Sequence, residues 1–363
     1  MKQGWEIKKL GEVCNINYGT RVVQKKDGGT IYPVYGGGGA TFKMDRYNRE
    51  DCLIVSRFAM SNQCVRYVRG KFFLNDSGLT IESNESELSQ SFLDKHITAL
   101  NDTIYSLGKG VAQKNLDIKE LRLLDIKYPK SREEQERIVA ELDCLSGIIE
   151  KKREQLRELD ALAQSIFYQM FGDPITNEKG WDVKKLGEVC KFSQGVQVDL
   201  PLQSTEKKSG WNRFLRIVDY TTCNTDIRYV NISNDKNFVN FDDVVVVRYG
   251  ASAGFVGIEK EGILANNLFK LNHDRNKLNY KYLYYLLSTD YYKDFVKDIA
   301  FGAAMPALSF NSFKNFNIYI PPIALQQEYA EKIEAIERQK ELIKQSITQT
   351  EELFNSRMDY YFN

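Results

Sequence analysis

Residues 4–14 read Gly-Trp-Glu-Ile-Lys-Lys-Leu-Gly-Glu-Val-Cys, and residues 180–190 read Gly-Trp-Asp-Val-Lys-Lys-Leu-Gly-Glu-Val-Cys. The two segments start 176 residues apart, close to half of the 363-residue chain. They differ only in Glu6 against Asp182 and in Ile7 against Val183, and both differences are conservative. Such agreement indicates an internal duplication, which has to be recognised before any fold is assigned.

Weaker matches extend the duplication along both halves. Gly19 corresponds to Gly195 at the same offset, and the apolar run 54–58 with its following Ser61 corresponds to 245–249 with Ser252. Arg57 is thereby matched with Arg248. Three further pairs are Gly110 with Gly302, Ala112 with Ala304, and Leu116 with Leu308. Because the halves share little between these anchors, the sequence predicts one scaffold that carries two different surfaces.

Each half ends in a long segment with a heptad pattern. The first runs from about residue 134 to 170 and the second from about residue 325 to the carboxyl end, and each follows a proline. Apolar side chains recur at alternating steps of four and three residues over more than four heptads, which favours a coiled coil over a surface helix. The predicted seam consists of Ile138, Leu142, Leu145, Ile149, Leu156, Leu159, Ile166, Tyr329, Ile333, Ile336, Ile343, Ile347 and Phe354.

The sequence thus predicts a mixed α/β fold of the α+β kind, with two pseudo-repeated globular domains joined by two long helices. A pseudo-twofold repeat would pair these helices as an antiparallel coiled coil, with a seam of roughly 50 Å over about 33 residues. The expected segments are a globular domain at 1–130, a long helix at 131–172, a second globular domain at 173–322 and a second helix at 323–363. Residues 54–55, 65–68 and 242–249 read as strands, and 280–287 and 291–296 as helices. The alternative is that each helix packs separately on its own half.

Composition excludes several classes of protein. The chain has 50 Lys and Arg against 49 Asp and Glu. It therefore lacks the large excess of positive charge that would by itself indicate a nucleic-acid-binding protein. The six cysteines include no Cys-x-x-Cys pair and the chain has only two histidines, so the spacing argues against a zinc site. We expect neither a secretory signal nor a membrane span, and therefore a cytoplasmic protein.

Catalytic motifs are missing, while polar clusters are present in both halves. The four glycines at 36–39 are not followed by the Lys-Ser/Thr of a phosphate-binding loop, and they do not match Gly-x-Gly-x-x-Gly. They predict a flexible turn or a main chain that can approach a ligand closely. With two histidines there is little material for a triad or a metal centre, so we expect no catalysis by this chain. Side chains that can bond base edges or phosphates make up the candidate nucleic-acid contacts Arg57, Ser61, Asn62, Gln63, Arg66, Lys109, Gln113, Lys114, Arg213, Arg248, Tyr249, Ser252, Asn266 and Asn267. For any single one of them an ordinary solvated loop residue is the better interpretation, whereas the matched Arg57 and Arg248 suggest a shared scaffold or phosphate-holding role.

The duplicated Gly-Trp-x-x-Lys-Lys-Leu-Gly-Glu-Val opening resembles the start of each target-recognition domain in the specificity subunits of type I restriction-modification systems. Segments 32–37, 110–116 and 171–174 and the helix starts at 134–139 and 325–330 resemble recurrent segments of the same family. The resemblance covers nearly the whole chain in order. One departure is that residues 305–308 read Met-Pro-Ala-Leu where residues 113–116 read Gln-Lys-Asn-Leu.

The resemblance implies that each globular domain reads one part of a bipartite, asymmetric target in double-stranded DNA. It also implies that the coiled coil sets the spacing and docks two methyltransferase subunits, which restriction or translocase subunits join. Methylation and cleavage would reside in those partners, so S-adenosylmethionine, ATP and Mg²⁺ would be bound there and no cofactor by this chain. The competing readings are a two-headed protein-binding scaffold and a stand-alone DNA-binding protein.

Charge is unevenly distributed among the four segments. Residues 1–130 carry 20 basic and 15 acidic groups, and residues 172–322 carry 19 and 17, so the two heads have net charges of +5 and +2. The first long helix (131–171) has 6 basic and 9 acidic groups and the second (323–363) has 5 and 8, so each helix has a net charge of −3. The neutral total therefore conceals two mildly basic heads, which predicts weak DNA binding by the chain alone and dependence on partners.

Overall fold

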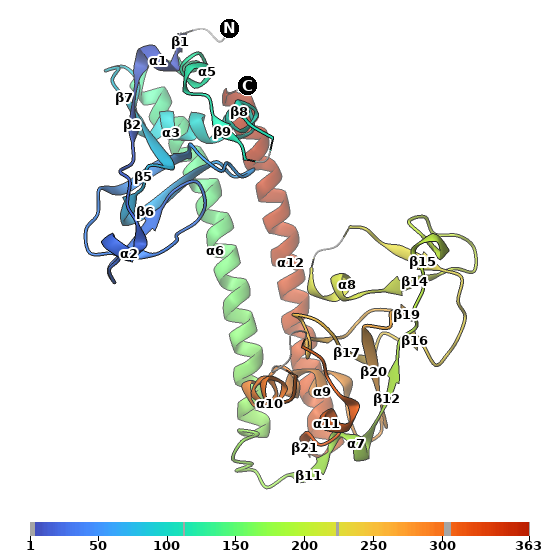
Figure 1. Cartoon of the computed structure of the whole chain (residues 1–363). Coiled ribbons are helices and arrows are strands. Elements are labelled where there is room, and N and C mark those ends of the chain that lie inside the picture. Colours follow the sequence, from blue (N-terminus) through green and yellow to red (C-terminus); the bar gives the residue numbers. More distant parts are fainter. Residues whose placement is uncertain (1–3, 112, 223–224, 301–305, 363) are drawn as a thin grey trace. The chain divides into compact units, whose positions relative to one another are not determined.

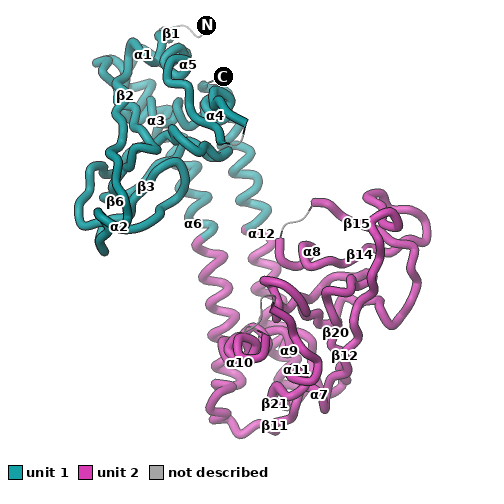
Figure 2. The backbone as a smooth tube through the Cα atoms, in the orientation of Figure 1, with its two compact units in different colours: residues 1–153, 344–363 teal, residues 154–343 magenta. Residues whose placement is uncertain are grey.

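The computed structural model of the chain describes residues 4–111, 113–222, 225–300 and 306–362. It divides into two compact units (Figure 2): unit 1 comprises residues 1–153 and 344–363, and unit 2 comprises residues 154–343. Each unit therefore contains one globular half, the start of one long helix and the end of the other. The expected division into four consecutive segments stays a prediction, because the boundaries of the units cross both long helices.

Unit 1 combines one six-stranded sheet, in the order β2-β7-β5-β6-β3-β4, with two strand pairs, β1-β10 and β8-β9 (Figure 1). Its elements in chain order are β1 (Trp5–Lys9), α1 (Leu10–Val13), β2 (Cys14–Tyr18), α2 (Gln24–Asp27), β3 (Tyr32–Tyr35), β4 (Lys43–Met44), β5 (Arg49–Ser56), β6 (Val65–Leu74), β7 (Gly78–Ser83), α3 (Gln90–Ala99), α4 (Asn101–Ser106), β8 (Gly108–Lys109), β9 (Asn115–Leu116), α5 (Ile118–Arg122), β10 (Asp125–Pro129) and the start of α6 (Arg132–Phe171).

Unit 2 combines sheets in the orders β12-β20-β17-β18 and β13-β15-β14-β19-β16 with the pair β11-β21. Its elements are the end of α6, β11 (Asp182–Lys185), α7 (Leu186–Val189), β12 (Cys190–Gln194), the 3₁₀ turn η1 (Leu200–Leu202), β13 (Gln203–Ser204), β14 (Asn212–Leu215), α8 (Ile217–Thr221), β15 (Arg228–Val230), β16 (Phe238–Val239), β17 (Val244–Val247), β18 (Val256–Gly257), β19 (Gly262–Leu264), β20 (Leu268–His273), α9 (Tyr280–Leu286), α10 (Asp290–Ala300), α11 (Phe310–Phe313), β21 (Asn317–Ile320) and the start of α12 (Ile323–Phe362).

The two units share the antiparallel order β2-β7-β5 and β12-β20-β17. These strands correspond in the duplication, as do the pairs β1-β10 and β11-β21. The strand β17 begins later than the predicted 242–249, because Asp243 accepts the main-chain N–H of Asn240 and its own N–H donates to the carbonyl of Asn240 in the preceding turn. It also ends earlier, at Val247. The predicted fold class is confirmed.

The repeated opening stretch forms the same strand-to-helix corner in each unit. Main-chain N–H groups at the end of β1 and β11 donate to glutamates three residues later, Lys9 to Glu12 at 3.0 Å and Lys185 to Glu188 at 3.4 Å. Each glutamate thereby satisfies a donor that the start of a short helix leaves without a helical partner. This explains why Lys-Leu-Gly-Glu occurs in both copies.

The leucine of each corner attaches the corner to the residue that directly precedes the last strand of its globular half, β10 or β21. Leu10 and Leu186 are completely buried. The main-chain N–H of Leu10 donates to the carbonyl of Leu124, and that of Leu186 to the carbonyl of Phe316, both at 2.8 Å. The duplicated sequence therefore specifies a corner in which the beginning and the end of each globular half are joined.

A buried glutamine joins each globular half to the start of its long helix. In unit 1 the Gln135 amide donates to the carbonyls of Glu87 and Pro129, at 2.6 and 2.7 Å, and accepts the N–H of Ser89 at 2.8 Å. Ser89 is the N-cap of α3, so one side chain links that helix to α6. Gln135 is completely buried, and all three bonds are to the main chain.

Unit 2 repeats this arrangement 191 residues later with Gln326, which is also completely buried. Its amide donates to the carbonyls of Lys277 and Pro321, at 3.1 and 2.8 Å, and accepts the N–H of Asn279 at 2.8 Å. Asn279 is the N-cap of α9, the counterpart of α3. The helix starts that resemble the family motif therefore contain the residue that attaches the helix to its head.

Segments of α6 and α12 pack antiparallel within each unit (Figure 1). In unit 1, Lys152 Nζ donates to Ser346 Oγ at 2.7 Å, and Tyr361 OH donates to Glu141 Oε2 at 2.7 Å. The early residues of α6 thus face the late residues of α12. The alternative of separately packed helices is wrong for this unit.

The same direction holds in unit 2, where Lys340 pairs with Asp160 at 2.8 Å and Tyr329 OH donates to the carbonyl of Ala163 at 3.4 Å. The side chains of the predicted seam are all at least half-buried. Buried are Ile138, Leu142, Ile149, Tyr329, Ile333, Ile336 and Ile347, and half-buried are Leu145, Leu156, Leu159, Ile166, Ile343 and Phe354.

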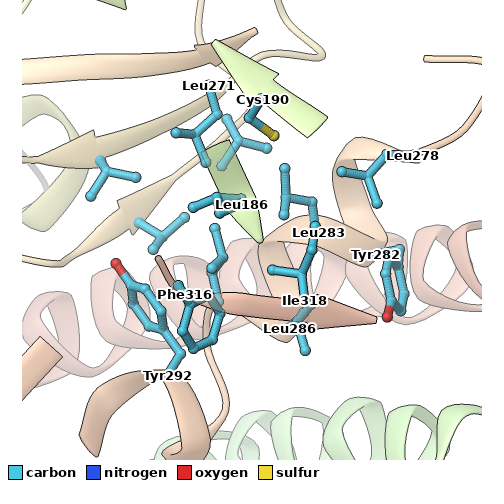
Figure 3. Close-up of a cluster of buried hydrophobic side chains, with 14 of the residues drawn as sticks. Leu186, Cys190, Leu271, Leu278, Tyr282, Leu283, Leu286, Tyr292, Phe316 and Ile318 are labelled. Atoms are coloured by element: carbon cyan, nitrogen blue, oxygen red, sulfur yellow. The ribbon is translucent and has the colours of Figure 1, made fainter. Parts of the chain in front are cut away.

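Each head shares its hydrophobic core with the helical segments of its own unit. In unit 2 the cluster shown in Figure 3 contains Leu186 of the repeated corner together with Tyr282 and Phe316. The ring of Phe167 on α6 stacks on Tyr282 with a centroid distance of 5.8 Å. Burial of this kind stabilises a domain in proportion to the apolar area removed from water, so the helix is part of the folded head.

Candidate nucleic-acid interface

Three loops of unit 1 meet at the end of the central strand β5. The main-chain N–H of Arg57 donates to the carbonyl of Ser77 at 2.8 Å, and the N–H of Leu116 donates to the carbonyl of Arg57 at 2.9 Å. The N–H of Gly19 donates to the carbonyl of Gly78 at 3.0 Å. We call this meeting of main-chain segments the three-loop junction of unit 1.

Unit 2 has a three-loop junction with the same main-chain bonds at the end of β17. Arg248 N–H donates to Asn267 O at 2.8 Å, Leu308 N–H to Arg248 O at 2.9 Å, and Gly195 N–H to Leu268 O at 3.0 Å. Sequence matching paired Gly19 with Gly195, Arg57 with Arg248 and Leu116 with Leu308, and the structure places each pair at equivalent positions. Gly302 and Ala304, as well as Ala112, lie outside the described residues.

The junctions explain the duplicated glycine. A Cβ atom on Gly19 would lie 1.9 Å from the carbonyl oxygen of Asn75, and one on Gly195 would lie 2.2 Å from that of Ala265. Neither distance is compatible with a side chain, so two main-chain segments approach each other here as only glycine permits.

The guanidinium groups of the matched arginines are engaged with the protein. That of Arg57 lies over the ring of Tyr18 at 4.8 Å and over that of Phe58 at 4.5 Å. That of Arg248 lies over the ring of Phe310 at 4.3 Å. Arg248 also donates to the carbonyl of Leu308 at 3.3 Å and to the amide oxygen of Gln194. These contacts favour the scaffold role over phosphate holding.

The guanidinium group of Arg66 is likewise engaged, by carbonyl groups of the glycine-rich loop 36–39 and of Gln63. Its guanidinium donates to the carbonyls of Gly37 at 3.1 Å, Gln63 at 2.8 Å and Gly38. A Cβ atom on Gly37 would lie 2.1 Å from the carbonyl of Phe58, so the close approach predicted for the glycines is made to the protein's own main chain. Arg66 therefore orders the loop 36–39 beside the junction.

The remaining unit 1 candidates lie on two loops next to this junction. Ser61, Asn62 and Gln63 are exposed. The N–H of Met60 donates to the carbonyl of Lys114 at 3.1 Å, so the loops carrying the two predicted clusters lie side by side.

In the second of these loops, each cationic candidate has a local partner. Lys109 bonds Asp117 at 2.6 Å, and this hydrogen bond raises the pKa of Lys109. The ammonium group of Lys114 lies 4.0 Å from the centroid of the Tyr105 ring. Gln113 is exposed and its amide makes no hydrogen bond within the described ranges of the chain. Of this cluster, Gln113 is thus the side chain best placed to meet a ligand.

The unit 2 candidates separate into structural and surface residues. Arg213 pairs at 3.3 Å with the buried carboxylate of Asp219, which places it in the framework of the unit. Tyr249 and Ser252 are half-buried beside the junction, where Tyr249 forms a bridge with Ala307. Met305 of the departing segment lies outside the described residues. Asn266 and Asn267 occupy the loop between β19 and β20, at the junction itself.

A basic lobe in unit 1 was missed by the sequence reasoning. Segment 19–47 contains five basic residues, Arg21, Lys25, Lys26, Lys43 and Arg46, all of them exposed. Its two acidic residues, Asp27 and Asp45, accept main-chain N–H groups of Val23 and Thr30. A count of charge in windows shorter than a domain would have identified this lobe, because it carries more than half of the +5 of residues 1–130.

Among the residues that the structure describes, no group of three or more His, Cys, Asp and Glu side chains could hold a metal ion. Within those same ranges, no helix is long and apolar enough to cross a bilayer.

The fold and its two junctions define a class of protein: an internally duplicated protein in which one main-chain framework carries two different sets of side chains. The chain belongs to the family of the type I restriction modification DNA specificity domain, whose pattern matches residues 2–159 and 178–352. The family resemblance of the sequence is thereby confirmed.

Relatives and solved structures agree with this family. The chain is 26% identical over 164 residues to the type I restriction enzyme MjaVIII specificity subunit of Methanocaldococcus jannaschii, covering 45% of this chain and 37% of the relative. It is 25% identical over 256 residues to the MjaIX specificity subunit of the same organism, covering 63% and 58%. The chain thus spans less than two thirds of the length of either relative.

The fold is similar to two solved structures. One is the S subunit of a type I restriction-modification system from M. genitalium, with a TM-score of 0.62, 16% identity and coverage of 98% of this chain and 95% of that one. The other comes from a study of complex assembly and conformational transition of the type I system, with a TM-score of 0.57, 17% identity and coverage of 100% and 98%. At these identities the likeness establishes the fold.

Proposed function

We propose that this chain is the DNA sequence-recognition subunit of a type I restriction-modification complex. Each globular half reads one part of a bipartite, asymmetric target in double-stranded DNA. The proposal is supported by membership of the DNA specificity family in both halves and by the names of the relatives.

The observation that carries the proposal is the pair of three-loop junctions. Their main-chain hydrogen bonds are the same, whereas Tyr18 corresponds to Gln194, Phe58 to Tyr249 and Ser77 to Asn267. A symmetric target would need two equal surfaces. Two unequal surfaces on one framework suit a target whose two parts differ in sequence, because bases are read by side chains and not by the framework.

Charge supports DNA as the ligand and also a need for partners. The basic lobe of unit 1 offers five exposed cationic side chains for phosphates, whereas unit 2 has a net charge of only +2 over residues 172–322. Non-specific affinity grows with the number of phosphates neutralised, so this chain alone should bind DNA weakly.

The partners in this proposal are two methyltransferase subunits and the restriction or translocase subunits, which act in the cytoplasm. S-adenosylmethionine, ATP and Mg²⁺ are bound by those subunits, and this chain contributes recognition without catalysis. The paired helices α6 and α12 set the spacing between the two half-targets and dock the methyltransferase subunits. Residues 1–130 and 173–322 are the target-recognition domains of this assignment.

The test is an exchange of residues 1–130 for the corresponding domain of another family member, in cells that also express the modification subunit. The genomic methylation motif should change in one half and keep the other half and the spacing. A motif that is unchanged after the exchange would count against the proposal. Affinity of the assembled complex for DNA should fall steeply with salt, whereas a protein-binding scaffold would show no such dependence.

A further inference from the structure

The loop between β19 and β20 presents two neighbouring asparagines on a main chain held from both sides. Asn266 N–H donates to the carbonyl of Val196 at 3.0 Å, and Asn266 O accepts the side-chain amide of Gln194 at 2.7 Å. Asn267 O accepts the N–H of Arg248 at 2.8 Å. The loop cannot shift without breaking these bonds, so the main chain from which both asparagine side chains project is fixed.

The side-chain amides of these asparagines have no partner among the described residues. Neither Asn266 nor Asn267 makes a side-chain hydrogen bond to any residue in the described parts of the chain. Asn267 is exposed and Asn266 is half-buried. An amide group with two donors and an acceptor that the protein leaves unused is available to a ligand.

Both asparagines are among the residues that line a hollow of about 580 Å³ in unit 2. Apolar side chains contribute half of its lining, namely Val198, Phe214, Ile217, Val218 and Ala265. The other polar lining residues are Gln197, which is exposed and also without a side-chain bond within the described ranges, and Gln203 and Arg216, which the protein engages. Gln203 donates to the carbonyl of Val198 at 2.9 Å, and Arg216 pairs with Asp219 at 3.3 Å.

We propose that Asn267, assisted by Asn266, recognises the adenine of an adenine–thymine pair in the half-target read by unit 2. This inference rests on the proposed function. Asparagine is the side chain that can bond adenine N6 and N7 together, and apolar surface is what meets the thymine methyl group. The lining of the hollow contains asparagine side chains and apolar side chains together. Because the main chain is held by Arg248, Val196 and Gln194, little further ordering is needed on binding.

The equivalent loop of unit 1 has a different chemistry. Ser77 corresponds to Asn267, because its carbonyl accepts the N–H of Arg57 as that of Asn267 accepts Arg248. Asp76 then corresponds to Asn266. A carboxylate only accepts and a hydroxyl is a single small group, so neither side chain by itself can make the paired donor-and-acceptor bonds of an asparagine to adenine. The same position therefore gives the two heads different base preferences.

The experiment uses the full chain assembled with its modification subunit. The methylation motif of the wild-type complex is first compared with the motif obtained after residues 1–130 are exchanged. The half-target that is the same in both motifs is the half read by unit 2. Replacement of its adenine by 7-deazaadenine, which lacks N7, should weaken DNA binding by the wild-type complex roughly tenfold at one position. This measurement needs no variant.

Variants then assign the effect to the loop. The double variant Asn266→Ala with Asn267→Ala should lose roughly tenfold in discrimination at that position and leave the other half of the motif unchanged. Asn267→Asp keeps the shape of the side chain but removes its donor, so it should lose the same preference without a change in folding. The control Asn276→Ala alters an exposed asparagine beyond the other end of β20 and should keep the full motif.

Two results would overturn the inference. One is a unit 2 half-target that contains no adenine sensitive to 7-deazaadenine. The other is a sensitivity to 7-deazaadenine that persists unchanged in both Asn267→Asp and the double variant. A failure of the proposed function has a different signature, since the wild-type complex would then give no bipartite motif at all.

Discussion

The buried glutamine at the start of α12 offers the sharpest test of how a head is attached to its long helix. Replacement of Gln326 by alanine removes three hydrogen bonds to the main chain of unit 2. The matched control is Gln327→Ala, because the neighbouring residue is the same amino acid and is exposed. A second variant, Gln326→Met, keeps most of the volume and removes only the hydrogen bonds.

The expected loss follows from the bonds that disappear. A net hydrogen bond contributes about 1 kcal/mol, and a buried group left without its partner costs about 1–3 kcal/mol. Two carbonyls and one N–H lose their partner in Gln326→Ala, so we expect about 3 kcal/mol of local stability to be lost. Gln327→Ala should change the stability by less than about 0.5 kcal/mol, as is typical of surface substitutions.

Hydrogen exchange read by mass spectrometry is the suitable assay, because it resolves α9 and the first turns of α12 separately from unit 1. A loss of about 3 kcal/mol should accelerate exchange in these peptides about 150-fold. Gln326→Met should be nearly as fast as Gln326→Ala if the hydrogen bonds are responsible. Equal exchange in Gln326→Ala and Gln327→Ala would refute the reasoning, and full rescue by methionine would assign the effect to packing instead.

Three further predictions concern unit 1, and urea unfolding of that unit measures each. Gly19→Ala should cost about 2–3 kcal/mol because its Cβ meets a carbonyl at 1.9 Å, whereas Gly39→Ala, with nothing within 4 Å, should change stability by less than about 0.5 kcal/mol. Burial lowers the pKa of His96 from 6.5 to about 4, so stability should be complete above pH 6.5 and fall by about 3 kcal/mol as the pH drops to 4. His96→Phe should remove this dependence of stability on pH, and an unchanged pH dependence in the variant would contradict the prediction. Lys152→Leu should raise the unfolding free energy by about 1 kcal/mol, since a polar residue in a helical seam specifies register at the expense of stability; a loss would contradict this.

The fold could be predicted from the sequence because its strongest signals are local or repeated. The heptad pattern predicted α6 and α12 to within a few residues, since the period of a seam depends only on neighbours three and four positions away. The corner at Leu10 and Leu186 was marked by duplication. What the sequence did not show was the reason for that duplication, namely main-chain bonds to Leu124 and Phe316, more than a hundred residues further along the chain.

The candidate interface was harder to predict, because the role of a polar side chain depends on what it meets. Arg248 meets Gln194, 54 residues earlier, and Arg66 meets the glycine loop 28 residues earlier. Both looked like ligand-binding cations in the sequence, and both are engaged within the protein. Asn267 looks no different in the sequence, yet its amide is free in the described parts of the chain. Residue type alone cannot separate these cases, since the distinction lies in long-range contacts.

The three-loop junctions suggest how such a chain changes what it reads without losing its fold. Positions 77 and 267 contribute their carbonyl groups to the junction, and every amino acid has that group. The side chains at these positions can therefore vary while the bond from Arg57 or Arg248 persists. The glycines at 19 and 195 cannot vary, because the close approach of main chain depends on the missing side chain. The duplication consequently keeps the glycine and the arginine and lets the serine and the asparagine differ, which is the pattern expected if the framework is fixed and only the reading residues are free to diverge.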